Sequence, residues 1–404
     1  MLKSIRPFAV LGGYWNAMSA ARVLHVTTGL NVGGAEIMLM RFLAHQDPGR
    51  FTPSVVSLMK PGPVANRIEA QKIAVSSMDM EPGKLLPAKL GRLRTAIKAA
   101  QADLYHGWMY HGNLVASLAA LTSGKPSPVI WSIHHSLHDI ENEKPLTANV
   151  IRTLARMSRH TFAISYCSRI AADHHERYGF DHRRRVVIPN GVDTDEFKPS
   201  EEARAKLRAL IGVPADRLIV GNFARFHPMK DQQRLVDSVA LLLNRGLDVQ
   251  ALFVGDGHDN AVLAQRANEL GVAERVTILE VRDDIRDIAP GLDAFAMTSS
   301  WGESFSLAAA EAMACAVPAI VTDIGDCAWV VGDASLVARP NDTESITKAL
   351  HRLLSISHAE RRKIGERARA RIREHFSMKE YVRRHAELYA NAIEAAPRAR
   401  KAER

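Results

Sequence analysis

Two glutamates eight residues apart are the part of this sequence best suited to bind a polyol. Glu303 lies in a short polar loop, and Glu311 lies in the alanine-rich run that follows. Serine favours helix N-caps and alanine favours helix, so we expect a helix that begins near Ser304 or Phe305 and places Glu311 about two turns inside it. The alanines would let a ligand's hydroxyls approach Glu311, and the first N–H groups of the helix could bind an anion.

Two cations that could bind a diphosphate follow a buried strand in the second half of the chain. The strand LIVGNFA is followed by Arg225 and Lys230, five residues apart, and then by a helical stretch. Across such a turn the two side chains can converge on one diphosphate, the guanidinium as a forked donor and the ammonium as a point charge. Two cations near a turn are common on protein surfaces, so the pair indicates diphosphate binding only in combination with other motifs.

Glycines and a histidine occupy comparable positions in the first half. Gly33 and Gly34 follow the first strand, RVLHVT, and open a helix, where the backbone can approach a phosphate closely. His134 directly follows the strand VIWSI, at the edge where open α/β sheets bind ligands. His134 and His138 would share a helix face if a helix began there, but no acidic third ligand stands at metal spacing. We therefore expect no metal site.

Strands and helices that alternate through both halves of the chain must position these residues. Repeated strand–turn–helix units predict parallel sheets with both faces covered. A chain of 404 residues with 47% apolar side chains is long enough for two cores. We expect two Rossmann-like, doubly wound domains of the α/β class. The expected divisions are a disordered extension at 1–20, a first domain at 21–190, a linker at 191–199, a second domain at 200–375, a helix at 376–395 and a basic tail at 396–404.

Several motifs occur in the order typical of the retaining glycosyltransferases of family 4, which have the GT-B fold. The spacing Glu303-x7-Glu311, the pair Arg225-x4-Lys230, GGAE after the first strand, PNGVDxxxF before the second domain and a GDG turn all resemble motifs of that family. The resemblance covers roughly residues 22–392. It implies two domains that face each other across a cleft, a last helix that crosses back to the first domain, and transfer of a sugar from a nucleotide diphosphate sugar to a hydroxyl.

The resemblance assigns a role to each matching residue. It implies that Arg225 and Lys230 stabilise the leaving diphosphate, that Glu303 holds the sugar hydroxyls, and that His134 reaches the sugar or the phosphate from the opposite domain. Glu311 would hold the ribose hydroxyls. The donor-binding residues that follow from the resemblance are Gly33, Gly34, Phe305, Ser306, Leu307 and Glu311.

These motifs encode neither the donor base nor the acceptor. Glu280 and Val281 stand where the family commonly has a glycine and then an apolar or aromatic residue, so no base identity follows. The resemblance implies a growing cell-surface glycan or a polyprenyl-linked acceptor in polysaccharide biosynthesis, such as that of lipopolysaccharide or capsule. A nucleotide-sugar epimerase and a catalytically silent nucleotide-sugar-binding protein are the alternatives, although each would be expected to lack part of the glutamate and cation motifs.

Composition narrows the class of partner. The net charge of +9 and the pI near 9.5 predict an acidic partner, such as a nucleotide, a lipid phosphate or an anionic membrane surface. Only 6% of residues are aromatic and no nucleic-acid-binding module is present, which argues against nucleic acid. Three cysteines without a C-x-x-C pair favour a reducing cytoplasm. We expect a cytoplasmic protein that needs no cofactor and no metal.

A basic stretch near residues 86–98 has two interpretations. Leu86, Leu90, Leu93 and Ile97 would share one face of a helix. Such a helix could pack on the sheet with a solvated basic back, or it could lie on the inner face of the cell membrane, and both can hold at once. The cations on its other faces are Lys89, Arg92, Arg94 and Lys98.

Overall fold

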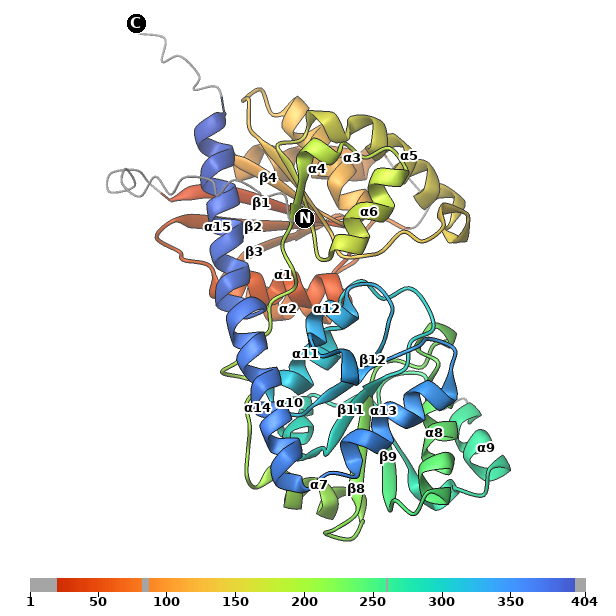
Figure 1. The fold of residues 1–404 in the computed structure, drawn as a ribbon. Helices are drawn as coiled ribbons and strands as arrows, with labels where there is room; N and C mark the ends of the chain where they lie inside the picture. Colours follow the sequence, from red (N-terminus) through yellow and green to blue (C-terminus); the bar gives the residue numbers. More distant parts are fainter. Residues whose placement is uncertain (1–19, 82–86, 259–260, 397–404) are drawn as a thin grey trace, which may run out of the picture.

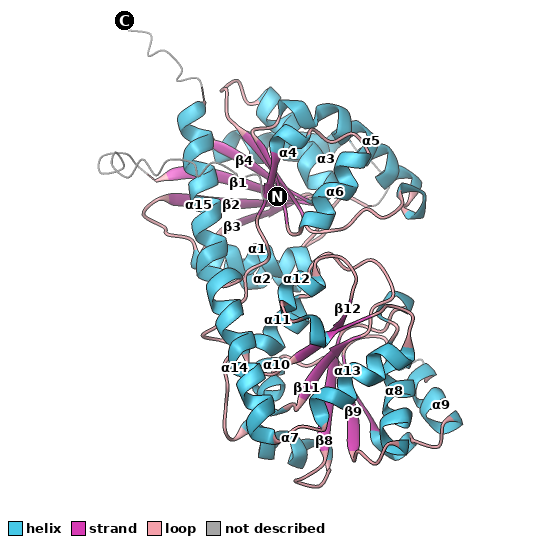
Figure 2. Ribbon diagram, in the orientation of Figure 1, coloured by secondary structure: helices cyan, strands magenta, loops and turns pink. Residues whose placement is uncertain are grey.

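The chain forms two α/β domains, spanned along one side by the last two helices (Figures 1 and 2). This computed structural model describes residues 20–81, 87–258 and 261–396. Except for Ala20 and Ala396, the expected extension at 1–20 and the expected tail at 396–404 lie outside the described residues, as does Leu86.

The first domain is built on a seven-stranded parallel sheet with the order β3-β2-β1-β4-β5-β6-β7. Its strands are β1 (Ala21–Thr27), β2 (Phe51–Ser57), β3 (Ala74–Ser77), β4 (Leu104–Trp108), β5 (Val129–Ile133), β6 (Ala163–Tyr166) and β7 (Arg185–Val187). Its helices are α1 (Gly34–His45), α2 (Pro63–Glu69), α3 (Pro87–Ala100), α4 (Met109–Thr122), α5 (Pro145–Met157) and α6 (Arg169–Arg177).

The second domain repeats the design with six parallel strands in the order β10-β9-β8-β11-β12-β13. Its strands are β8 (Leu218–Phe223), β9 (Val249–Val254), β10 (Val276–Leu279), β11 (Ala294–Met297), β12 (Ala319–Thr322) and β13 (Val337–Ala338). Its helices are α7 (Ala203–Ile211), α8 (Gln232–Asn244), α9 (Val262–Glu269), α10 (Ile285–Ile288), α11 (Leu307–Ala314), α12 (Cys327–Val331), α13 (Thr343–Leu354) and α14 (His358–His375).

Burial and strand order together locate the ligand-binding edge of each sheet. Central strands such as β4, β9 and β12 are buried at every position, as expected of parallel strands with helices on both faces. In the first sheet the order reverses between β1 and β4, and in the second it reverses between β8 and β11. Open α/β sheets bind ligands in the crevice beyond the carboxyl ends of the strands at such a reversal. The loops after β1, β8 and β11 are therefore the places to look for a site.

The last helix, α15 (Met378–Ala395), returns to the first domain (Figure 1). Tyr381 and Tyr389 are buried in the core of the first domain, and the ring of Tyr381 meets Phe42 of α1 with 5.7 Å between centroids. Where the chain crosses between the domains, the N–H of Met378 donates to the carbonyl of Val192 at 2.8 Å. The expected architecture, two Rossmann-like domains with a last helix that crosses back, is confirmed.

The expected start of the helix that bears Glu311 is wrong by two to three residues. The helix α11 begins at Leu307, not at Ser304 or Phe305. The carbonyl of Ser304 accepts from the N–H of Asp326 at 3.2 Å, and a Cβ on Gly325 would lie 2.2 Å from the carbonyl oxygen of Glu303. The turn that contains Gly325 therefore holds the loop before α11 and keeps it out of the helix.

Three histidines lie between α15 and the first sheet. His25, His106 and His385 are all 0% exposed. His106 Nδ1 lies 2.5 Å from the hydroxyl of Tyr389, and its Nε2 lies 2.7 Å from Ser132 Oγ. Burial lowers the pKa of His25 and of His385 to about 3, and burial also lowers the pKa of His106 well below its usual value. All three are therefore neutral at neutral pH.

We expect the free energy of unfolding to fall when the pH is lowered from 7 to 5. His25 and His385 have a pKa of 6.5 in the unfolded chain and about 3 in the fold, so in this range the unfolded chain binds more protons. The stabilising contribution of the neutral histidines is complete above pH 6.5 and is lost toward pH 3, by about 2 kcal/mol for each histidine between pH 7 and 5. Urea unfolding at pH 7, 6 and 5 measures the change, and an unfolding free energy that stays constant contradicts the expectation.

Candidate active site

Lys230 and Glu303 meet at the reversal point of the second sheet. Lys230 ends a short turn after β8, and Glu303 follows β11. Lys230 Nζ lies 2.5 Å from Glu303 Oε1, and Ser299 Oγ donates to the same oxygen at 2.7 Å. The side chains are 20% and 8% exposed, respectively. An ammonium suited to phosphate and a carboxylate suited to hydroxyls are therefore held side by side at the mouth of the sheet.

The turn that presents Lys230 is fastened to the end of β11. Thr298 Oγ1 donates to the carbonyl of Lys230 at 3.0 Å and to that of Asp231 at 3.1 Å. The N–H of Ser300 donates to the carbonyl of Met229 at 2.9 Å. These bonds fix the backbone of Lys230, and the contact with Glu303 holds its ammonium before any ligand arrives.

Arg225 lies at the start of the same turn with its side chain exposed to solvent. The turn after β9 holds the backbone here, because the N–H of Phe226 donates to the carbonyl of Asp256 at 2.6 Å. Gly255 has φ +156, and a Cβ there would lie 2.1 Å from the carbonyl oxygen of Ala224, so this close approach requires glycine. Within the described ranges, no side-chain hydrogen bond or ion pair engages the Arg225 guanidinium. It is therefore available to bind an anion.

A cavity of about 320 Å³ opens beside Arg225 at the carboxyl ends of β9 and β10. Glu280 and Val281, the positions at which the sequence departs from the family pattern, are among its lining residues. Glu280 is exposed, and Val281 is 64% exposed. The departure from the family pattern therefore falls on the wall of a cavity at the carboxyl edge of the second sheet.

Glu311 has a partner that the sequence did not indicate. Arg41 of α1 lies against it, with Nη1 2.7 Å from Glu311 Oε1. Burial raises the pKa of Glu311, and the charge and hydrogen bond of Arg41 oppose that rise. The alanines of α11 do not form an open surface around the carboxylate, because most of them pack into the core of the second domain: Ala309, Ala310, Ala312 and Ala314.

The predicted donor-binding residues before Glu311 lie at the start of α11. Phe305 is 6% exposed and meets Phe376 with 5.7 Å between ring centroids, so its side chain belongs to the core. Ser306 is the N-cap residue, and its side chain makes no capping hydrogen bond. The first backbone bond of the helix runs from the N–H of Ala310 to the carbonyl of Ser306, which leaves the N–H groups of residues 307–309 without helical partners. The free N–H groups at the N-terminal end of the helix therefore lie two to three residues later than expected.

His134 lies at the carboxyl end of β5 and is held from two sides. Its ring stacks on Trp108 with 5.2 Å between centroids and 7° between planes. Its Nδ1 lies 3.0 Å from Asn190 Oδ1, so this nitrogen carries the proton and donates. Burial lowers the pKa of His134 to about 4. At neutral pH the ring is uncharged, and its Nε2 is an acceptor. His138 shares no helix with it, since residues 134–139 form none.

Gly33 and Gly34 form the N-terminal end of α1, after the strand at the reversal point of the first sheet. Gly33 is the N-cap residue in an extended conformation, and a Cβ there would lie 2.4 Å from Glu36 Oε2. Glu36 lies in the first turn, as expected of a carboxylate that favours the helix dipole. Burial raises the pKa of Glu36.

The two domains touch across the site. Ser136 Oγ, two residues after His134, donates to the carbonyl of Gly302 at 3.3 Å. Asp326 of the second domain accepts from the N–H of Arg169, at the start of α6, at 2.6 Å. The Arg169 guanidinium lies over the Trp329 ring, 3.9 Å from its centroid. The loop with His134 and the loop with Glu303 are therefore brought together from opposite domains.

Both halves of the chain match known protein families. Residues 32–196 match the family described as Glycosyltransferase Family 4, and residues 203–371 match the family described as Glycosyl transferases group 1. The chain belongs to the family 4 glycosyltransferases. The junction between the two matched regions falls at the linker between the two sheets.

Individual relatives of this glycosyltransferase agree with the assignment. EpsF of Bacillus subtilis (strain 168) is 29% identical over 317 residues, which cover 76% of this chain and 80% of EpsF. A D-inositol 3-phosphate glycosyltransferase of Nocardia farcinica is 34% identical over 190 residues, 44% of this chain and 42% of that protein. The crystal structure of HepE of Anabaena in complex with UDP superposes with a TM-score of 0.80 at 24% identity and covers 92% of this chain and 100% of HepE. That likeness confirms the GT-B fold.

Sequence reasoning missed four residues that contact the candidate site, and all of them except Ser299 are distant in sequence from the residues that they contact. These residues are Arg41, Ser136, Asn190 and Ser299. Arg41 lies 270 positions from Glu311, and no local spacing marks it. Asn190 belongs to the motif PNGVDxxxF, but nothing in that motif pairs it with His134. Over the described residues, no group of three or more His, Cys, Asp or Glu side chains could hold a metal ion.

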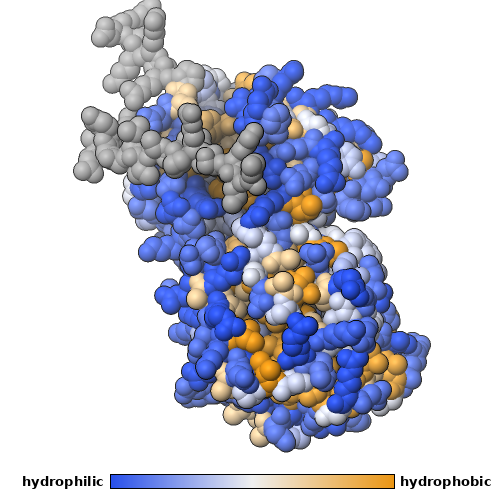
Figure 3. All heavy atoms as spheres, in the orientation of Figure 1, coloured by the Kyte–Doolittle hydropathy of each residue, from blue (hydrophilic) through white to orange (hydrophobic). Residues whose placement is uncertain are grey.

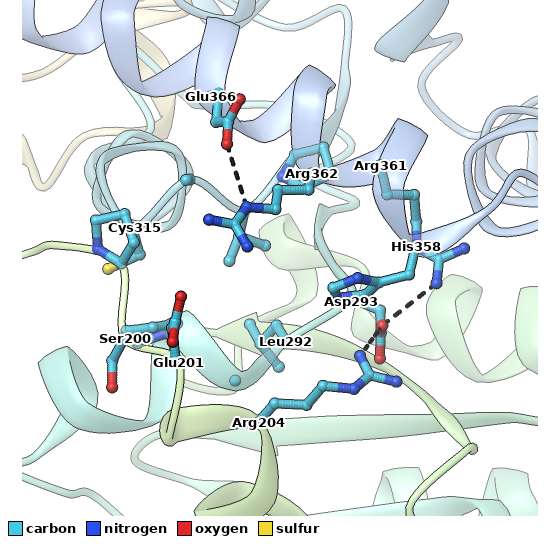
Figure 4. Close-up of a pocket in the computed structure, with 16 residues that line it drawn as sticks. Ser200, Glu201, Arg204, Leu292, Asp293, Cys315, His358, Arg361, Arg362 and Glu366 are labelled. Atoms are coloured by element: carbon cyan, nitrogen blue, oxygen red, sulfur yellow. Dashed lines mark hydrogen bonds and ion pairs between the residues drawn. The ribbon is translucent and has the colours of Figure 1, made fainter.

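A pocket of about 540 Å³ lies apart from these residues, between α7 and α14 (Figure 4). Asp293, with a 1% exposed side chain, receives ion pairs from Arg204 and Arg361, and Arg208 Nη2 lies 2.6 Å from its Oδ2. Arg362 is paired with Glu366 on the opposite wall (Figure 4). These contacts join the start of β11 to α7 and α14, which gives the cluster a structural role.

Proposed function

We propose that this glycosyltransferase moves a sugar from a nucleotide diphosphate sugar to a hydroxyl of a cell-surface glycan or a lipid-linked acceptor, with retention at the anomeric carbon. The observation that supports this most directly is the 2.5 Å contact between Lys230 Nζ and Glu303 Oε1. A diphosphate needs a cationic donor, and the hydroxyls of the sugar attached to it need an acceptor. Lys230 and Glu303 supply this donor and this acceptor side by side.

Stabilisation of the leaving group falls to the two cations. When the bond between the anomeric carbon and the phosphate oxygen breaks, negative charge grows on the diphosphate. Lys230, Arg225 and the N–H groups at the start of α11 are donors that can stabilise this charge. In front-face attack the acceptor oxygen bonds to the anomeric carbon, and the leaving phosphate oxygen takes the acceptor's proton, so no protein base is required.

His134 suits the sugar better than the phosphate. A neutral ring whose Nδ1 donates to Asn190 presents a bare Nε2, which accepts a hydrogen bond from a hydroxyl and gives none to a phosphate oxygen. Glu303 and His134 would then hold sugar hydroxyls from opposite domains, while Glu311 accepts from the ribose.

The donor class is supported by three crystal structures of HepE, which contain UDP, UDP with glucose, and UDP-glucose. The direct experiment is to measure thermal stabilisation by UDP-, GDP- and ADP-sugars and then transfer with the best donor. A ligand at 100 times its dissociation constant adds about 2.7 kcal/mol to stability. Transfer should persist in EDTA, because cations of the chain neutralise the diphosphate. Loss of transfer in EDTA with rescue by manganese would overturn the metal-free assignment.

We also propose that the protein works in the cytoplasm and attaches reversibly to the inner face of the cell membrane. No helix in the described part of the chain is both long and apolar enough to span a bilayer, and the face drawn in Figure 3 is largely hydrophilic. In α3, Leu93 and Ile97 are buried in the first domain, while Arg94 and Lys98 are exposed. Each basic side chain at an anionic surface adds about 1 kcal/mol.

Membrane attachment of this kind depends on charge. The protein should sediment with anionic vesicles but not with neutral ones, and added salt should release it. Reversal of charge at Arg94 and Lys98 should weaken the binding. Equal recovery with both kinds of vesicle would refute the electrostatic attachment.

A further inference from the structure

We propose that Arg41 is a positioning residue for nucleotide binding: from the first domain it holds the Glu311 carboxylate of the second domain in the orientation that accepts the ribose hydroxyls. The inference rests on the proposed role of Glu311. It adds that the ribose site is completed only when the two domains are in contact.

The ion pair joins elements that are themselves well fixed. Arg41 lies on α1 between buried core residues, and its side chain is 15% exposed, while that of Glu311 is 14% exposed. The guanidinium also lies 5.5 Å from the centroid of the Phe197 ring in the linker. One turn further along α1, His45 Nε2 lies 3.1 Å from Asp193 Oδ2 of the same linker. The α1 helix, the linker and α11 are therefore connected at the place where Glu311 lies.

The geometry leaves room for a second set of hydrogen bonds on Glu311. An ionised carboxylate has about four lone-pair sites on two oxygens. Arg41 donates to Oε1 at 2.7 Å, and no other side chain in the described part of the structure donates to the carboxylate. Oε2 and the second site of Oε1 can therefore accept from the two ribose hydroxyls. Burial raises the pKa of Glu311, so without Arg41 the charged, accepting form would be held less firmly.

The competing interpretation is an ion pair that only fastens the domains together. Partly buried ion pairs often have this role, and breaking one destabilises the fold without touching a ligand. The two interpretations differ in one respect. A fastening pair would affect every ligand of the cleft alike, whereas a positioning residue affects only ligands that carry the ribose hydroxyls.

The experiment compares nucleoside diphosphates with their 2′,3′-dideoxy analogues by calorimetry. UDP, GDP and ADP are titrated first, and the one that binds wild type best is carried forward with its dideoxy form. Wild type should bind the dideoxy form at least ~10-fold more weakly, because hydrogen bonds to a carboxylate are lost. Arg41→Met should weaken binding of the parent diphosphate by a similar factor and change that of the dideoxy form less than about 2-fold.

Two further variants secure the comparison. Arg41→Lys keeps the charge and should restore part of the discrimination, and it also serves if Arg41→Met does not fold. Arg67→Met, at an exposed position of α2, is the matched control and should bind both ligands like wild type. If Arg41→Met weakens both ligands equally, the pair only fastens the domains and the inference is wrong. If wild type itself does not distinguish the two ligands, the ribose role of Glu311 fails first.

Discussion

We expect Lys230→Ala to lower the turnover of sugar transfer at least ~100-fold, which is the usual cost of removing one preorganised donor from a developing negative charge. The backbone of Lys230 is held by Thr298, and its ammonium lies at the mouth of the sheet beside Glu303. Only the side chain is lost in the variant, so the turn should keep its conformation. Since the charge on the diphosphate grows as the bond to the sugar breaks, the loss should appear in kcat more than in KM.

Arg225→Ala should have an effect of the same order with an even smaller change in stability. Its side chain is exposed and makes no hydrogen bond or ion pair with the residues described here. Arg352→Ala, at an exposed cation near the end of α13, is the control and should retain wild-type turnover. The measurement is the initial rate of transfer with the best donor, beside a thermal unfolding curve for each variant. Near-normal turnover of either site variant, or unfolding of Arg225→Ala, would show that the cation has a different role.

The parts of the site that could be predicted from sequence are those fixed by local spacing. Arg225 and Lys230 lie on one strand-to-helix turn, and Glu303 and Glu311 lie on one loop and helix, so their separation along the chain sets their separation in space. The alternation of strands and helices could also be predicted, because each element follows from the pattern of residues within its own segment. The strand order then placed both segments at the reversal point of the second sheet, where open α/β sheets bind ligands.

Contacts between the domains could not be predicted in this way. Ser136 reaches the carbonyl of Gly302 across 166 residues, and nothing in either stretch signals the other. The start of α11 was misjudged for the same reason, because the carbonyl of Ser304 is engaged by Asp326 from a later turn. Propensity alone favoured a helix there, and a tertiary hydrogen bond overrode it.

Two helices of the first domain carry weaker signals in the sequence. The α4 helix has the sequence MYHGNLVASLAALT and carries small or apolar residues on most sides, so it lacks the polar face that reveals an amphipathic helix. Its Gly112 packs so closely on β1 that a Cβ would lie 2.4 Å from the carbonyl oxygen of Val26. The α5 helix begins with Pro145 at its first position, a start signal that was not used.

Replacement of each glutamate by glutamine should separate sugar binding from ribose binding. Glu311→Gln should raise the dissociation constant of the free nucleoside diphosphate about 10-fold, because the ribose hydroxyls lose a charged acceptor. Binding to the ribose is equal in the ground state and the transition state, so KM should rise while kcat changes little. The variant also leaves Arg41 without its charged partner, and because the pair is only partly buried, the loss in stability should be smaller than the about 3–5 kcal/mol of a broken buried pair.

Glu303→Gln should differ from Glu311→Gln in its effect on affinity for the free nucleoside diphosphate and in its effect on turnover. Glu303 faces the sugar in this assignment, so a nucleoside diphosphate without a sugar has no contact to lose. Its removal also frees Lys230 Nζ, which Glu303 Oε1 holds at 2.5 Å, and the ammonium can then turn fully to the phosphate. Affinity for the free diphosphate should therefore stay level or increase, while turnover of the nucleotide sugar falls about 100-fold. Calorimetry measures the affinity of each variant for the free diphosphate, and initial rates measure its turnover of the nucleotide sugar. If Glu303→Gln weakens binding of the free diphosphate as much as Glu311→Gln does, both carboxylates serve the nucleotide, and the division between sugar and ribose is false.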